Sequence, residues 1–293
     1  MTPLRRPRQP ILHTIHRAPR TPSPAKSPPL LFLHGGYVDA RSWDVHFLPF
    51  FANHGYDCHA LDFSGHGGSD GREYLDALSL DDYLADAQRV IAGFDQAPIV
   101  IGHSMGSFIA ERLLEKSLAA AAVLLAPVPR NGTLESATKL LLKYPKFLGE
   151  VVNVTRGRVS ATALHMIKDV YFSPTTKPET LLRFAQLVQP ESTRAICDLA
   201  LLGCWRWTPK PPPAQPVLVL GGRLDTVFPP QLIRPLAQRW NAELQIVPDT
   251  GHALILDEHW SDCAATVLGW LERHAPQLPT QASEHTSELA CIA

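Results

Sequence analysis

The sequence predicts an α/β fold in which a mostly parallel central sheet is flanked by helices and interrupted by a helical insertion. Short apolar runs of strand length alternate with helical patterns along most of the 293-residue chain, as a parallel sheet with helical crossovers requires. This alternation stops between Val128 and Pro213, where only helical patterns occur. Because 45% of the residues are hydrophobic, the chain can bury one large core, which favours one domain with an insertion over two domains.

The central sheet is expected to form from apolar runs that are bounded by turn-forming or polar residues, a pattern typical of buried parallel strands. These runs are Leu30–Leu33, Asp57–Leu61, Pro98–Ile101, Ala121–Leu125, Pro216–Leu220 and Leu244–Val247. Before them, Ile11–His16 is expected to form a short first strand. The rest of residues 1–29 is expected to be flexible or partly extended.

Helices are expected between these strands and throughout the insertion. Ser79 begins one helix, because it is a good N-cap with Asp82 three residues later, and the helix that carries Trp270 closes the fold. The expected insertion helices are Glu135–Leu148, Ser160–Lys168, Pro178–Val188 and Glu191–Leu202. The chain therefore divides into a core of residues 30–127 and 214–275, a helical insertion of residues 128–213, and a flexible tail of residues 276–293.

The segment Gly102–Gly106 reads Gly-His-Ser-Met-Gly and stands between an apolar strand run and a helical pattern. In this context G-x-S-x-G predicts a sharp turn that lifts the Ser104 hydroxyl clear of the sheet. The two glycines allow the strand and the helix to approach closely. The segment therefore predicts a nucleophilic serine, which needs a base and an orienting acid because a free hydroxyl is a poor nucleophile.

An acid and a base follow later in the chain, each on a loop directly after a strand run. Asp225 follows the run that ends at Leu220, and His252 follows the run that ends at Val247. Ligand sites of open α/β sheets gather at the carboxyl ends of strands, so Asp225 and His252 are predicted to complete a triad with Ser104. Asp249 is the alternative acid.

Two backbone N–H groups should stabilise the negative charge that develops on a substrate oxygen. One is expected from Met105, at the start of the helix after the nucleophile. The other is expected from Gly36, in the loop that follows Leu30–Leu33, with Tyr37 as the alternative. His34 is interpreted as a structural support of this loop.

Five segments in the same order resemble serine hydrolases of the α/β-hydrolase family, in particular the monoglyceride lipase and lysophospholipase-type branch. They are residues 33–36, 62–69, 102–106, 221–225 and 251–252. Ser64 departs from the family pattern, which usually has arginine there in a structural loop. The resemblance implies the α/β-hydrolase fold, with the insertion as a lid above Ser104.

Aromatic side chains of the insertion are candidates for an apolar acyl-binding pocket, together with Tyr37 and the run Leu140–Leu142. The aromatic candidates are Tyr171, Phe172, Trp205 and Trp207. For each of them, packing of the lid onto the core is the alternative interpretation.

The composition limits the other classes of function. A net charge of −1 gives no electrostatic reason to expect nucleic acid as a partner. No transmembrane segment, cofactor motif or metal signature is found, and His13 and His16 have no evident partner ligands. The five cysteines form no C-x-x-C pair, which favours reduced thiols and a cytoplasmic location. The oligomeric state is not determined by the sequence.

The leading functional hypothesis is a carboxylic ester hydrolase that cleaves a neutral, apolar acyl ester or thioester through an acyl-serine intermediate, without a cofactor. The same triad could instead serve carbon–carbon bond hydrolysis, a lyase reaction or acyl transfer. A non-catalytic binding protein on this fold is the third hypothesis. Haloalkane dehalogenase and epoxide hydrolase activities are disfavoured, because both need a carboxylate nucleophile at the position of Ser104.

Overall fold

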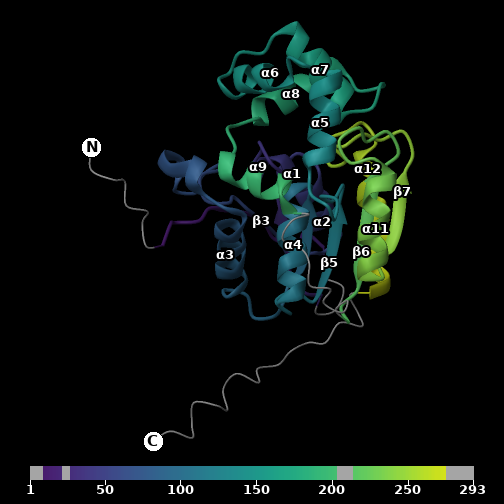
Figure 1. The fold of residues 1–293 in the computed structure, drawn as a ribbon. Helices are drawn as coiled ribbons and strands as arrows, with labels where there is room; N and C mark the ends of the chain where they lie inside the picture. Colours follow the sequence, from purple (N-terminus) through teal and green to yellow (C-terminus); the bar gives the residue numbers. More distant parts are fainter. Residues whose placement is uncertain (1–8, 22–26, 203–213, 275–293) are drawn as a thin grey trace, which may run out of the picture.

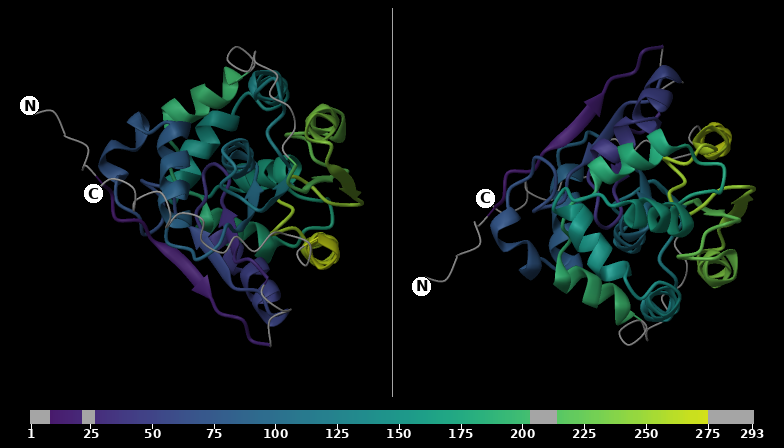
Figure 2. Two further views of the ribbon diagram at one scale, coloured as in Figure 1. Left: turned by 90° about the horizontal axis from the view of Figure 1, so that it is seen from below. Right: turned by 90° about the horizontal axis from the view of Figure 1, so that it is seen from above.

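A computed structural model describes residues 9–21, 27–202 and 214–274. Within these residues the strands form one seven-stranded sheet in the order β1-β3-β2-β4-β5-β6-β7. The strands are β1 (Thr14–Arg17), β2 (Leu30–Leu33), β3 (Cys58–Leu61), β4 (Ile99–His103), β5 (Ala121–Leu125), β6 (Val217–Gly222) and β7 (Glu243–Val247). Only β1 pairs antiparallel, with β3, and it lies at the border of the molecule opposite β7 (Figure 2). The predicted mostly parallel α/β fold is confirmed.

Helices cover both faces of the sheet (Figure 1). One face packs against α1 (Arg41–Asp44), α2 (Phe47–Asn53) and α12 (Trp260–His274). The other face packs against α3 (Leu80–Ile91), α4 (Met105–Glu115) and α11 (Pro230–Trp240). Successive side chains of a strand point to opposite faces, so Phe32 joins the first core and Leu33 the second. A 3₁₀ helix, η1 (Arg72–Ala77), precedes α3, whose predicted N-cap Ser79 forms a capping box with Asp82.

Between β5 and β6 the chain forms a series of helices, several of which lie at the top of the molecule in Figure 1. They are α5 (Leu134–Lys143), α6 (Phe147–Thr155), α7 (Ala161–Tyr171), α8 (Pro178–Leu187) and α9 (Thr193–Ala200). The prediction of a single helix over Glu135–Leu148 is wrong. Pro145 separates α5 from α6, because a proline disfavours helical geometry in the residue before it and has no N–H to donate.

The start of α9 also differs from the sequence prediction. Glu191 precedes the helix, because the Ser192 hydroxyl caps its first turn by accepting a hydrogen bond from the Ala195 N–H at 3.1 Å. Among the described residues, no helix is both long and apolar enough to span a bilayer.

The order of the strands creates a crevice at one end of the sheet. The chain leaves β2 toward β3 on one side, whereas it leaves β4 toward β5 on the other side. The loops after the neighbouring strands β2 and β4 therefore diverge at their carboxyl ends, which is where open α/β sheets bind ligands. The loop after β2 contains Gly36, and the turn after β4 contains Ser104.

Glu191, between α8 and α9, fixes the helical insertion to the core. Its carboxylate is fully buried and lies 3.1 Å from the buried His66 Nε2, and it accepts a hydrogen bond of 2.8 Å from the Tyr83 hydroxyl. Burial alone would raise the pKa of Glu191, but the charge of His66 and hydrogen bonds from His66, the Ser192 N–H and Tyr83 lower it to about 2. Burial would lower the pKa of His66, but Glu191 raises it. The two side chains therefore form a buried ion pair.

We expect Glu191→Gln to reduce the free energy of unfolding by about 3–5 kcal/mol near neutral pH, because it leaves the His66 charge buried without a counter-charge. The folded-state pKa of Glu191 lies below its ordinary value of 4.5. The contribution of the Glu191 charge is therefore complete above about pH 4.5 and is lost as the pH falls toward 2. The contribution of the His66 charge is complete below its ordinary pKa of 6.5 and is lost as the pH rises through its raised folded-state pKa. Urea unfolding of both proteins at several pH values measures this difference.

The matched control is Glu135→Gln, which removes an exposed carboxylate paired with Lys139. It should change the free energy of unfolding by less than about 0.5 kcal/mol. A Glu191→Gln variant as stable as this control would contradict the ion-pair assignment.

Candidate active site

Ser104 lies at the tip of a strained turn between β4 and α4. Its φ and ψ angles are 51° and −116°, a conformation that side-chain-bearing residues rarely adopt. The flanking glycines make the turn possible. A Cβ on Gly102 would lie 2.3 Å from the Gly106 carbonyl oxygen, and one on Gly106 would lie 2.2 Å from the Leu33 carbonyl oxygen. The predicted turn is therefore present.

The structure brings Ser104, His252 and Asp225 into one chain of hydrogen bonds. The His252 Nε2 atom lies 3.1 Å from the Ser104 Oγ, and its Nδ1 atom lies 2.9 Å from Asp225 Oδ2. The other carboxylate oxygen accepts hydrogen bonds from the Val227 and Phe228 N–H groups at 2.8 Å and 2.7 Å. These contacts fix the carboxylate so that Nδ1 of His252 keeps its proton and Nε2 can accept the proton of Ser104.

Asp249, the alternative acid, is exposed and has a positive φ of 52°. Asp225, in contrast, is buried against His252. The contact with His252 therefore favours Asp225 over Asp249 as the candidate acid.

His103, the second residue of the turn, supports the backbone of His252. Its Nε2–H donates a hydrogen bond of 2.9 Å to the His252 carbonyl oxygen. Burial, together with the neighbouring His252, lowers the pKa of His103 to about 3, so its imidazole is neutral. Sequence reasoning assigned no role to His103, although its place within the G-x-S-x-G segment was a signal.

The loop after β2 lies directly against Ser104. A Cβ on Gly35 would lie 2.9 Å from His103 Nδ1 and 3.3 Å from the Ser104 Cβ, so any larger residue would force these buried neighbours to shift. The Tyr37 N–H is already engaged by Glu191 Oε2 at 3.2 Å, which leaves Gly36 as the loop's candidate donor. The Met105 N–H lies in the first turn of α4, where helix N–H groups have no intrahelical partner.

His34 has the supporting position that the sequence indicated. Its Nδ1–H donates to the Gly35 carbonyl oxygen at 2.8 Å, and its Nε2 accepts a hydrogen bond from the Phe63 N–H at 3.2 Å. The ring therefore connects the loop after β2 to the loop after β3. Burial lowers the pKa of His34, which is consistent with a neutral side chain that has one donor and one acceptor.

Sequence reasoning missed a second support of the same loop, in the segment between α8 and α9. The Gln189 N–H donates to the Tyr37 carbonyl oxygen at 2.8 Å, and its side-chain amide donates to Asp39 at 3.0 Å. Together with Glu191, Gln189 ties the insertion to the loop that carries Gly36. No local pattern signals these contacts, because they join residues about 150 positions apart.

Ser104 and His252 open into a pocket of about 200 Å³ whose walls are largely aliphatic and aromatic. Helices α5 to α9 supply much of the lining, and the segments that follow β2, β4, β6 and β7 also contribute to it. Glu150 is the one carboxylate among the described lining residues, and neither lysine nor arginine is among them. The pocket therefore suits an apolar, uncharged group.

Only some of the residues predicted to line the pocket do so. Tyr37, Tyr171 and Leu140 line the pocket. Phe172 does not: it is buried in the core, where its ring packs 5.1 Å from that of Phe184. Its side chain points away because it follows Tyr171 directly at the end of α7. Trp205 and Trp207 lie outside the described residues.

Comparison with known proteins agrees with this geometry. The "Putative non-heme bromoperoxidase BpoC" of Mycobacterium tuberculosis is 28% identical over 257 residues, which cover 76% of this chain and 86% of the relative. Its crystal structure has a TM-score of 0.69 at 25% identity, covering 90% of this chain and 96% of that chain.

Two solved structures at lower identity share the fold. A thermophilic esterase from Thermogutta terrifontis has a TM-score of 0.67 at 19% identity and covers 89% of this chain and 93% of its own. The monoacylglycerol lipase of Paleococcus ferrophilus has a TM-score of 0.66 at 17% identity and covers 90% of this chain and 99% of its own. The assignment to a monoglyceride lipase-type branch stays a prediction. The Alpha/beta hydrolase family model matches residues 30–266, and the chain belongs to this family.

Proposed function

We propose that the protein is a serine esterase that hydrolyses a neutral ester of an apolar carboxylic acid. The observation that carries this proposal is the chain of hydrogen bonds from Ser104 through His252 to Asp225, with Ser104 in the wall of an apolar pocket. The base is within hydrogen-bond reach of both the nucleophile and the orienting acid, as acyl transfer requires.

In the proposed reaction, His252 accepts the hydroxyl proton while the Ser104 Oγ attacks the ester carbonyl carbon. The N–H groups of Gly36 and Met105 donate hydrogen bonds to the carbonyl oxygen as it becomes negative. His252 then gives its proton to the departing alcohol, which leaves an acyl-serine. Water attacks this ester in the second half-reaction, again with His252 as the base, and releases the acid.

The substrate class follows from the pocket. We propose that residues 128–213 act as a lid over a core formed by residues 30–127 and 214–275, because helices α5 to α9 supply much of the pocket wall. An acyl chain in this pocket leaves water and gains free energy for each buried methylene. A charged acyl group has no lysine or arginine partner among the described lining residues.

Acyl transfer to hydrogen peroxide is the second candidate, because the relative BpoC is named a non-heme bromoperoxidase. Peroxide would replace water in the second half-reaction and release a peracid, which can oxidise bromide while it is reduced to the acid. Bromination that requires peroxide, a carboxylic acid or ester, and Ser104 would support this candidate. Ester hydrolysis with no such bromination would support the esterase.

We expect a fluorophosphonate probe to add one label to the wild-type protein and none to Ser104→Ala, as measured by intact mass. Ester hydrolysis should fall by at least about 10⁴-fold in this variant, because the covalent route is lost. The matched control is Ser136→Ala, since Ser136 also lines the pocket but no described side chain is hydrogen-bonded to its hydroxyl. Equal labelling of Ser104→Ala and the wild type would disprove the assignment of Ser104 as the nucleophile.

We also expect kcat/KM for p-nitrophenyl esters to rise with acyl chain length by up to about fourfold per methylene, and then to fall once the pocket is full. Val154→Phe should move the optimum to a shorter chain, because Val154 lines the pocket. Val152→Phe is the matched control on the same helix, since Val152 is exposed. Efficiency that declines steadily from acetate onward in the wild type would argue against an acyl pocket.

A further inference from the structure

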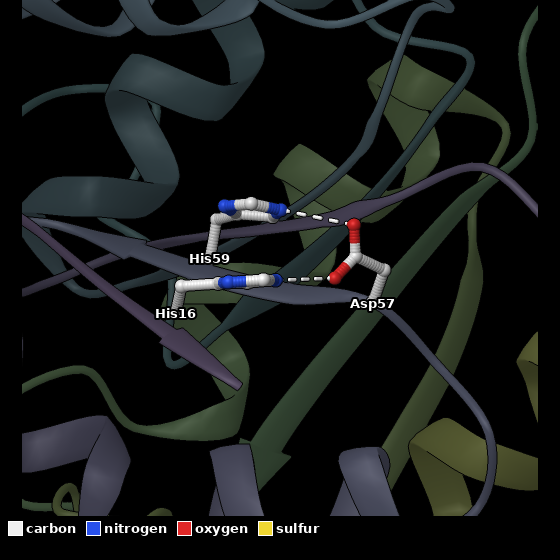
Figure 3. Close-up of side chains that lie close together, drawn as sticks. All are labelled: His16, Asp57 and His59. Carbon is white, nitrogen blue, oxygen red and sulfur yellow. Dashed lines mark hydrogen bonds and ion pairs between the residues drawn. The ribbon is translucent and has the colours of Figure 1, made fainter. Parts of the chain in front are cut away.

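A second group of ligating side chains lies where β1 meets β3. His16 and His59 face each other as a cross-strand pair, with ring centroids 4.3 Å apart and an interplanar angle of 14°. Figure 3 shows both rings with their Nε2 atoms directed at the carboxylate of Asp57, the residue before β3. The distances are 2.6 Å from His16 Nε2 to Oδ1 and 3.1 Å from His59 Nε2 to Oδ2. The expectation that His16 lacks partner ligands is therefore wrong.

The group is charged and reaches the solvent. Burial would raise the pKa of Asp57, but hydrogen bonds and charge interactions with His16 and His59 together lower it, so the side chain is a carboxylate. The side chains of His16 and Asp57 are 49% and 42% exposed. An ion from solution can therefore reach the space between the three side chains without opening the fold.

We propose that His16, Asp57 and His59 bind a divalent transition-metal ion of the zinc type. Two imidazole nitrogens and one carboxylate oxygen are a donor set that zinc prefers, with water completing the tetrahedron. The ligand atoms lie within 4.8 Å of one another. Tetrahedral zinc bonds of about 2.0–2.1 Å require a separation of about 3.4 Å between ligand atoms. His16 Nε2 and Asp57 Oδ1, which lie 2.6 Å apart, therefore need to move apart by about 0.8 Å, and no pair of ligand atoms needs to approach by more than about 1.4 Å.

Metal binding has to remove the hydrogens from both Nε2 atoms. In the structure each Nε2 carries the hydrogen that it donates to Asp57. When the ion binds, both Nε2 atoms and a carboxylate oxygen become its ligands. The two Nε2 hydrogens pass to water, and each bound ring carries one proton, on Nδ1, as a zinc-ligating imidazole requires.

The site would act on the edge of the sheet and not on the reacting atoms. β1 enters the sheet only through its pairing with β3, so a shared metal ion would cross-link this edge strand and stabilise the folded state. Asp57 precedes β3 at its amino end, whereas Ser104 follows the carboxyl end of β4, and these strands run in the same direction. Metal binding should therefore leave ester hydrolysis unchanged.

The test uses the full chain without a polyhistidine tag, stripped of metal and titrated with zinc chloride in a calorimeter. We expect one saturable site in the wild type. His16→Ala should bind zinc at least about tenfold more weakly. Zinc should raise the thermal midpoint of the wild type but not that of His16→Ala. The matched control is His165→Ala, which removes an exposed histidine paired with Asp169 alone and should behave as the wild type.

Asp57→Asn provides a second variant, because it keeps the shape and an acceptor oxygen while it removes the charge. It should also bind zinc more weakly, and its ester hydrolysis should equal that of the wild type, which shows that the variant is folded. Absence of saturable zinc binding by the wild type would overturn the proposal. Zinc binding of wild-type strength in both His16→Ala and Asp57→Asn would place the ion elsewhere and overturn it equally.

Discussion

The contact between β2, β4 and α4 is the constraint on which the active site depends. The helix passes so close to the strands that a Cβ on Gly106 would overlap the Leu33 carbonyl, and one on Gly102 would overlap Gly106. This close approach holds the turn between strand and helix in the conformation that Ser104 occupies. It also brings the loop after β2 against the serine, so one packing contact places both the nucleophile and the candidate oxyanion donors.

The helical insertion has two connected roles in this arrangement. Its helices form much of the pocket wall, and the segment between α8 and α9 holds the loop after β2 through Gln189 and Glu191. The wall that contacts an acyl chain and the loop that contacts the carbonyl oxygen are therefore parts of one hydrogen-bonded unit. The buried Glu191–His66 pair connects this unit to the core, and removing one partner costs more than it would in an exposed pair because a charge stays buried without a counter-charge.

The sequence was sufficient to predict the sheet and the proximity of Ser104, Asp225 and His252, because each of these residues follows an apolar strand run whose carboxyl end faces the crevice. It was insufficient where contacts between residues far apart in the chain determine the position of a side chain. Glu191 and Gln189 lie between two helices, with no strand to indicate where they point. Pro145 divided an apparently continuous helical pattern, and no bounds were predicted for α11, which contains Pro235. The partners of His16 became evident only from the antiparallel pairing of β1 with β3.

The central claim is that an acyl group is carried on Ser104 during turnover. Mixing the protein with excess p-nitrophenyl butyrate, quenching in acid within milliseconds and measuring the intact mass tests this directly. We expect a butyryl adduct that maps to the peptide containing Ser104 and disappears once the ester is consumed. Turnover without any adduct, accompanied by no initial burst of p-nitrophenol, or an adduct on a residue other than Ser104, would contradict it.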